Sequence, residues 1–94
     1  MVAAGPKGRP DLQEVGDYVQ TRRGHLGLSQ AQLAELAGID KGTVSRLETG
    51  ATWPWSTKRA AIEKALGLQP GALNEARKQA AAGISLFVRQ DGAA

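Results

Sequence analysis

The stretch LSQAQLAELAGIDKGTVSRLETG, residues 28–50, decides the fold of this chain, because its residue types suit two short helices joined by a tight turn. Ser29 can cap the first helix, in which Leu33 and Leu36 belong to an apolar stripe. Gly38 follows the last periodic residue, where a glycine adopts a left-handed conformation at little cost. The stretch therefore predicts a helix that ends in a sharp turn at Gly38.

The second half of the stretch predicts another helix with two different faces. Asp40 is a good N-cap for it, and Gly50 would close it. At about 100° per residue, Val44 and Leu47 fall on one side, which predicts a core face. The opposite arc holds charged, hydroxyl and small residues: Lys41, Gly42, Ser45, Arg46 and Thr49. Such an arc suits phosphate oxygens and guanine O6 and N7, so the two helices are predicted to form a DNA-binding helix-turn-helix.

Residues 19–68 resemble the phage-repressor and Cro-like (XRE-type) helix-turn-helix family, whose pattern is RxxxGLSQxxLAxxxGxxxxxVSxxExG, then a proline and a last helix that ends in LG. The resemblance covers about half of the chain in one unbroken register. Its carriers are Arg23, Leu28, Ser29, Gln30, Leu33, Ala34, Gly38, Val44, Ser45, Glu48, Gly50, Pro54, Leu66 and Gly67. The resemblance implies an all-α fold, a compact bundle of about five helices with a central helix-turn-helix.

The resemblance also implies roles for individual residues. In this family the glutamine that begins the second helix holds a phosphate, which is the place of Gln30, and the front of the third helix reads the major groove. From the residue types we expect four base contacts: Lys41, Gly42, Ser45 and Arg46. The expected phosphate contacts are Gln30, Thr43, Thr49, Thr52, Lys58 and Arg59.

A structural ion pair is implied as well. The paired Arg and Glu of the family correspond to Arg23 and Glu48, which would tie the first helix to the third. This chain departs from the family at two places. In the family, the front of the third helix often carries Gln, Ser or Asn, but here this helix begins with Lys41 and a glycine. The second departure is that Trp53 and Trp55 lie on either side of the loop proline. Both departures leave the base preference open.

The N-terminal residues 1–10 are expected to form a flexible arm, because glycine, proline and small residues there defeat regular structure. A terminus without a defined partner is the simpler interpretation. The alternative is a basic arm whose Lys7 and Arg9 contact a DNA groove beside the reading helix.

Three more helices are expected to complete a domain over residues 11–82. The first would begin at Asp11, end near Gly27 and bury an apolar stripe: Leu12, Val15, Val19 and Leu26. A later helix, capped by Ser56 or Thr57, would turn one face inward: Ala61, Ile62, Ala65 and Leu66. Its outward residues would be Lys58, Arg59, Glu63 and Lys64. Pro70 would open the last helix.

Residues 83–94 are expected to form a short extended tail. Ile84, Leu86 and Val88 alternate with other residues in the period of a strand. Because a lone strand is not stable in water, the tail would pair with its copy in a dimer, dock on the bundle or begin a further domain. The sequence leaves these alternatives open.

The aromatic residues and the histidine are interpreted structurally. At least one of Trp53 and Trp55 is expected to anchor the core, which leaves the other to press on a deoxyribose or donate its indole N–H to a phosphate. His25 is expected at a solvent-exposed helix end. We do not expect it to be a catalytic base, since no carboxylate and hydroxyl partners for it lie nearby in the sequence.

Composition agrees with a small helical domain. The chain has 94 residues, of which 41% are hydrophobic and only 4% aromatic, and its net charge of +3 gives weak attraction to phosphate by itself. With no cysteine and one histidine, disulfides, zinc sites with Cys or His pairs and thiol catalysis are excluded. We also expect no other metal site, no cofactor and no catalysis. No apolar run reaches membrane length, and no apolar signal core is present, so a cytoplasmic protein is expected. The family resemblance implies a bacterial or phage origin.

These observations predict a sequence-specific regulator of transcription, a repressor of phage or plasmid type that occupies a double-stranded DNA operator. It would bind as a homodimer or as a monomer on an asymmetric site, without a membrane or a small-molecule substrate. The alternative is an antitoxin or bridging protein, which keeps the helix-turn-helix but mainly binds a protein partner. An enzyme that uses His25 would lack a second catalytic group.

Overall fold

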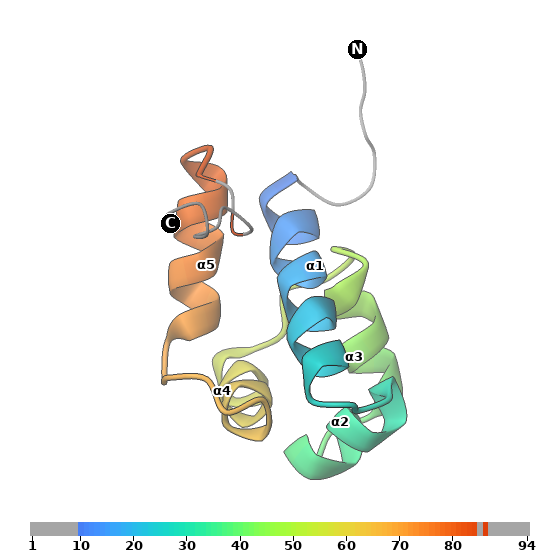
Figure 1. The fold of residues 1–94 in the computed structure, drawn as a ribbon. Helices are drawn as coiled ribbons and strands as arrows, with labels where there is room; N and C mark the ends of the chain where they lie inside the picture. Colours follow the sequence, from blue (N-terminus) through green and yellow to red (C-terminus); the bar gives the residue numbers. More distant parts are fainter. Residues whose placement is uncertain (1–9, 85, 87–94) are drawn as a thin grey trace.

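Five α-helices make up the described part of the chain, residues 10–84 and 86, in the computed structural model (Figure 1). They are α1 (Pro10–His25), α2 (Gln30–Ala37), α3 (Lys41–Glu48), α4 (Ser56–Ala65) and α5 (Ala72–Ala81). These residues contain no strand, which confirms the predicted all-α bundle with α2 and α3 as its central pair. Within the same residues, no helix is long and apolar enough to cross a membrane.

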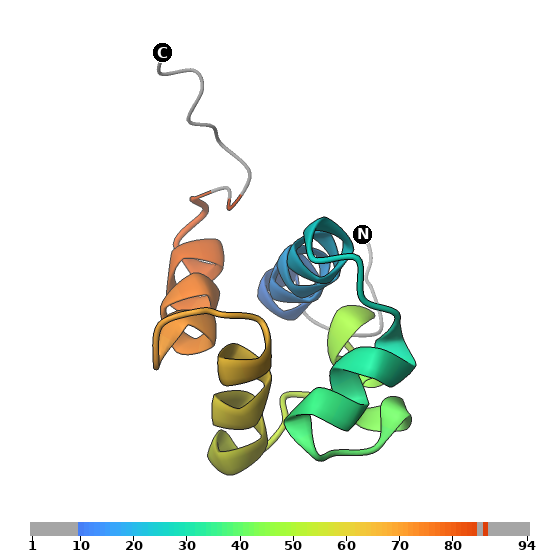
Figure 2. The same ribbon diagram turned by 60° about the horizontal axis from the view of Figure 1, so that its bottom comes forward.

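The helices surround one apolar core. α1 lies between α3 and α5, while α2 packs against both α3 and α4 (Figures 1 and 2). Each helix or its C-cap contributes two buried residues to this core: Val15, Val19, Leu33, Ala34, Val44, Leu47, Ile62, Leu66, Leu73 and Ala76. Because α2 and α3 have eight residues each and are too short to be stable alone, this shared core is what holds the turn between them.

α1 and α3 approach each other closely at Gly16. A Cβ atom at this position would lie 2.4 Å from the carbonyl oxygen of Glu48 and 2.5 Å from that of Leu47. By its low helix propensity alone, a glycine at this position would only weaken α1. The structure shows instead that the missing side chain allows the backbone of α1 to contact the last turn of α3.

Two apolar residues predicted to face the core are exposed instead. Leu36 is 63% exposed and Leu26 is 44% exposed. In α2, Leu33, Ala34 and Ala37 share one arc, and Leu36 points about 100° away from its middle. Leu26 follows the end of α1 and lies in the turn that Gly27 closes. The apolar stripe of each segment is therefore narrower than its composition suggested.

The start of α5 is capped by a residue predicted to face solvent. Glu63 of α4 is only 5% exposed, and its carboxylate accepts hydrogen bonds from the N–H groups of Gly71, at 3.0 Å, and Leu73, at 2.9 Å. The outward position expected for Glu63 is therefore wrong. α5 begins at Ala72 rather than at Pro70, since Gly71 takes a left-handed conformation as its N-cap and supplies no side chain. A carboxylate from the neighbouring helix satisfies these N–H groups instead.

The cap predicted for α4 is also wrong. Trp55, not Ser56 or Thr57, occupies the N-cap position, and no side chain accepts a hydrogen bond there. Both hydroxyl residues lie inside the first turn of the helix.

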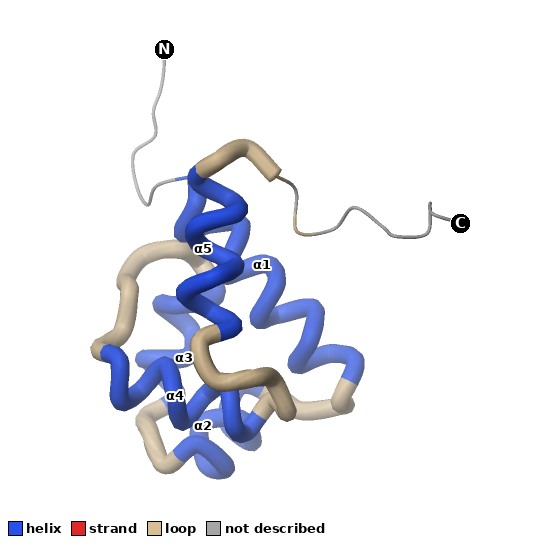
Figure 3. Tube along the Cα trace, turned by 90° about the vertical axis from the view of Figure 1, so that its left-hand side faces the viewer, coloured by secondary structure: helices blue, strands red, loops and turns tan. Residues whose placement is uncertain are grey.

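The described residues after α5 lie at the end of the bundle where α1 begins (Figure 3). Leu86 packs against the core, and its N–H donates a 3.1 Å hydrogen bond to Glu14 of α1. Ile84 is 54% exposed. The strand predicted over residues 84–89 falls mostly outside the described residues, as do Lys7 and Arg9 of the predicted arm.

An ion pair between Asp11 and Arg77 joins α1 to α5 and is expected to make stability depend on pH. Burial alone would raise the pKa of Asp11, but the 3.0 Å hydrogen bond from Arg77, the charge of Arg77 and hydrogen bonds from backbone N–H groups together outweigh burial and hold the pKa below its ordinary value. Since the pKa is lower in the folded state, the pair stabilises fully above the unfolded value, and this stability is lost as the pH falls through the folded value.

The measurement is urea unfolding of the parent and of Asp11→Asn at neutral pH and at successively lower pH. The variant is expected to be less stable near neutrality and to lose less stability on acidification. Parallel pH profiles for the two proteins would contradict this role of Asp11.

Candidate nucleic-acid interface

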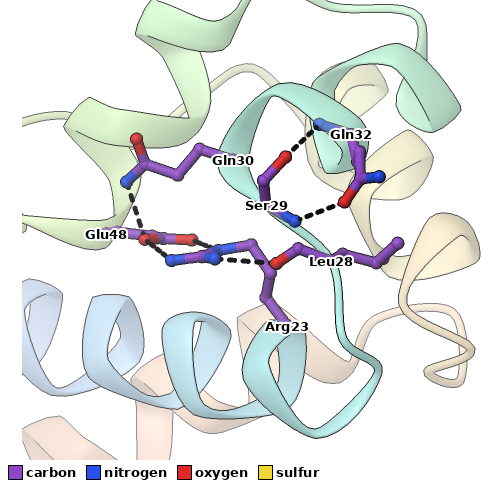
Figure 4. Close-up of polar contacts among 6 residues, drawn as sticks. All are labelled: Arg23, Leu28, Ser29, Gln30, Gln32 and Glu48. Carbon is purple, nitrogen blue, oxygen red and sulfur yellow. Dashed lines mark hydrogen bonds and ion pairs between the residues drawn. The ribbon is translucent and has the colours of Figure 1, made fainter.

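Local capping interactions define the two ends of α2 and the start of α3. The hydroxyl of Ser29 accepts a 3.0 Å hydrogen bond from the N–H of Gln32, whose side chain accepts one of 2.8 Å from the N–H of Ser29 (Figure 4). At the other end of α2, Gly38 adopts the predicted left-handed conformation with a φ of 70°. Asp40 then caps α3. Both ends of the turn therefore depend on short-range interactions, as the sequence indicated.

α3 has one face in the core and one at the surface. Val44 and Leu47 are buried, whereas Lys41, Arg46 and Thr49 are exposed, and Gly42 and Ser45 are half-buried. We call the surface formed by Lys41, Gly42, Ser45 and Arg46 the reading face. The structure thus brings the four predicted base-contact residues together on one side of a single helix.

An acidic side chain borders the reading face, which the sequence did not lead us to expect. Asp40 was predicted only as a cap, yet its Oδ2 lies 4.0 Å from Nη2 of Arg46. The carboxylate is held by the hydroxyl of Thr43, at 2.6 Å, and by the N–H of Thr43, at 3.0 Å. These hydrogen bonds, aided by the charge of Arg46, keep the pKa of Asp40 below its ordinary value, so the acid is charged at neutral pH.

Thr43 differs from its predicted role as a phosphate contact. Its side chain is buried, and the hydroxyl donates to Asp40. The residue sits on the arc of α3 that turns inward, beside Val44. In this position Thr43 stabilises the N-cap of α3 and does not present its hydroxyl at the surface.

Arg23 of α1, Gln30 of α2 and Glu48 of α3 form one network (Figure 4). Nε and Nη2 of Arg23 donate to the two carboxylate oxygens of Glu48 at 2.6 and 2.9 Å, and Nη1 donates to the carbonyl of Leu28 at 2.8 Å. The hydrogen bond to Glu48 raises the pKa of Arg23 further above neutrality. The ion pair implied by the family resemblance is therefore present, and it joins α1 to α3.

The same carboxylate also contacts the residue predicted to hold a phosphate. Nε2 of Gln30 donates a 2.9 Å hydrogen bond to Glu48, so one of its two amide N–H bonds points inward. This contact fixes the rotation of the amide and directs its remaining polar atoms away from Glu48. Sequence reasoning missed this interaction, because residues 30 and 48 lie on different helices.

The predicted phosphate contacts beyond α3 fall into two groups. Thr49, Thr52 and Lys58 are exposed. Arg59, by contrast, is half-buried, donates a 2.6 Å hydrogen bond to the carbonyl of Pro54 and stacks 4.7 Å above the ring centre of Trp53. The guanidinium of Arg59 therefore holds the loop between α3 and α4 in place, and the outward position predicted for it is wrong.

The two tryptophans have separate environments. Trp53 packs against the core, and Arg77 of α5 also lies over its ring, at 4.8 Å. Trp55 is 80% exposed. Sequence reasoning predicted that one tryptophan would be an anchor, which the structure confirms, but it could not identify the two arginines that stack on Trp53.

The geometry defines the class of this protein: two short helices joined by a left-handed glycine turn, with the second helix exposing a basic face, form a helix-turn-helix. The chain belongs to the helix-turn-helix domain family, which matches residues 14–76. This match confirms the family resemblance that the sequence pattern indicated.

Two solved structures of regulators resemble the fold. The restriction-modification controller protein C.AhdI from Aeromonas hydrophila is 31% identical, with a TM-score of 0.65 over 69% of this chain and 98% of its own. The clp gene regulator ClgR from C. glutamicum is 23% identical, with a TM-score of 0.64 over 87% of this chain and 100% of its own. None of the curated protein sequences matches the chain significantly.

Proposed function

We propose that the chain is a sequence-specific regulator of transcription, a repressor of the phage or plasmid type that binds double-stranded operator DNA and excludes other proteins from it. Membership of the helix-turn-helix family and the 31% identity to a restriction-modification controller protein support this function. The observation that carries the proposal is the reading face, a basic surface on a helix whose opposite side is locked in the core.

In the proposed complex, α3 lies in the major groove. Lys41 and Arg46 donate to the O6 and N7 acceptors of guanine, and Ser45 makes a shorter contact with a base edge. The half-buried Gly42 has no side chain, so the backbone of α3 can approach the bases there. A helix of this diameter fits the width of the groove, which is why α3 can reach the bases without deformation of its own backbone.

Phosphate contacts on either side of the groove would orient α3. We assign them to Gln30, which is half-buried, and to the exposed residues Thr49, Thr52 and Lys58. The hydrogen bond from Gln30 to Glu48 supports this assignment for Gln30, because a fixed amide loses less conformational entropy when it binds a phosphate. Thr43 and Arg59 are not assigned as phosphate contacts, since their side chains donate hydrogen bonds to Asp40 and to the carbonyl of Pro54.

Replacing Arg46 by alanine is expected to weaken binding to the best site by about 1–3 kcal/mol and to relax the base preference at one position. Lys58→Ala is expected to weaken binding to all sequences alike and to reduce the salt slope by about one. Fluorescence anisotropy with specific and random duplexes at several salt concentrations distinguishes the two effects. Equal losses on both kinds of DNA for both variants would contradict the assigned roles.

The function is tested by selecting duplexes from a random pool with the purified protein at two salt concentrations and sequencing those retained. One enriched motif is expected, and its symmetry distinguishes a dimer on a palindrome from a monomer on an asymmetric site. If no motif is enriched and binding vanishes at physiological salt, the proposal is wrong and a protein partner becomes the better explanation.

A further inference from the structure

Asp40 and Arg46 face each other across Gly42 at the front of the reading face. A Cβ atom at Gly42 would lie 3.0 Å from Nη1 of Arg46 and 3.0 Å from Oδ2 of Asp40. The guanidinium and the carboxylate therefore meet over the space that a side chain at position 42 would occupy. Such distances are tighter than an ordinary van der Waals contact, so a methyl group there would displace one group or both.

The carboxylate is the fixed member of this contact. Both of its oxygens accept hydrogen bonds from Thr43, which is itself buried, so the acid cannot rotate freely. Arg46, in contrast, carries a long side chain that is 54% exposed. A fixed charge 4.0 Å away restricts the conformations that such a guanidinium samples.

We propose that Asp40 is a positioning residue that holds the guanidinium of Arg46 over Gly42 and thereby sharpens the discrimination of one G·C base pair. The inference rests on the proposed function, because it assumes that the reading face binds DNA.

Two physical effects support this role for Asp40. A guanidinium that is already oriented loses less freedom when its planar fork meets guanine O6 and N7, so the correct base gains affinity. The carboxylate also repels nearby phosphates, which weakens binding where no base contact compensates. Asp40 would therefore raise specific binding at the base read by Arg46 and lower binding to random DNA.

The experiment begins with the motif selected by the parent protein and with the position at which Arg46→Ala relaxes the preference. At that position, the affinities for all four base pairs and for a random duplex are measured for the parent, Asp40→Asn, Gly42→Ala and the double variant. Asparagine is also a good N-cap, so Asp40→Asn removes the charge and keeps the cap. Asp17→Asn, an exposed aspartate on α1, controls for the change in net charge.

Asp40→Asn is expected to reduce discrimination at the Arg46 position by about three- to fivefold, the effect of an exposed charge pair, with other positions unchanged. Its affinity for random DNA should rise by about twofold. Gly42→Ala should reduce discrimination at the same position, and Asp40→Asn should change discrimination less in the Gly42→Ala background than in the parent, because the contact between Asp40 and Arg46 is already broken there. Asp17→Asn should leave discrimination unchanged.

Other outcomes would overturn the inference. Unchanged or increased discrimination in Asp40→Asn, losses spread over all positions, or multiplicative losses in the double variant would show that Asp40 does not act through Arg46. A loss of both specific and random binding, with an altered circular dichroism spectrum, would show that Asp40 acts only as the N-cap of α3 and does not position Arg46. If the parent enriches no motif, the proposed function fails together with the inference, whereas a motif that is insensitive to Asp40 overturns the inference alone.

Discussion

Glu48→Ala is expected to lower the free energy of unfolding by about 3–5 kcal/mol, which is a large part of the stability of a domain of this size. The carboxylate is 3% exposed and receives hydrogen bonds from Arg23 and Gln30. Its removal leaves the guanidinium of Arg23, itself only 15% exposed, without a counter-charge. The resulting loss reflects an unpaired buried charge more than the net value of the ion pair.

The measurement is chemical unfolding followed by circular dichroism. As a control, the double variant Arg23→Met, Glu48→Leu replaces both charges by apolar groups of similar length. It is expected to recover most of the loss, since no unpaired charge remains. A loss below about 1 kcal/mol for Glu48→Ala would show that the pair behaves like an exposed surface pair and does not tie α1 to α3.

The second large effect is expected for Gly16→Ala, which should destabilise the protein by about 3 kcal/mol or lose the fold. The new Cβ would lie 2.4 Å from a carbonyl oxygen of α3. A backbone atom cannot move aside as the end of a flexible side chain can, so α1 and α3 must separate and the core between them loses contacts.

Gly24→Ala is the matched control, because this glycine lies on the same helix and a methyl group added to it would meet no atom of another segment within 4 Å. Here alanine is expected to stabilise the protein by about 0.5 kcal/mol, since it restricts the unfolded chain and favours the helix. Thermal unfolding of the two variants should therefore shift in opposite directions. A stabilising effect of Gly16→Ala would contradict the close approach of the two helices.

The residues around the turn show how far a sequence can predict this fold. Ser29, Gly38 and Asp40 act on backbone groups within three or four residues, so their types and spacing were enough to place both helix boundaries. The periodicity of Val44 and Leu47 likewise identified the buried face of α3. From these local signals, the position of the reading face on α3 also followed.

The first residues of α4 and α5 were harder to predict. The left-handed Gly71 shifts the start of α5, although Pro70 suggested an earlier beginning. Trp55 occupies the N-cap of α4 although hydroxyl residues follow it directly. In both cases the local signal was reasonable, and at α5 the carboxylate of Glu63 in α4 binds the N–H groups that a local cap would otherwise satisfy.

The sequence by itself determined the helical segments, the glycine turn between α2 and α3 and the set of residues on the reading face, because caps, turn glycines and helical periodicity act between near neighbours in the chain. Only the tertiary structure decided the close approach of α1 and α3 at Gly16, the burial of Glu63 and the stacking of Arg59 on Trp53. The contact between Asp40 and Arg46 belongs with these, since it crosses the helix at a spacing that no helical period marks. Each of these features depends on which surfaces meet in space, and a pattern along one chain does not specify that.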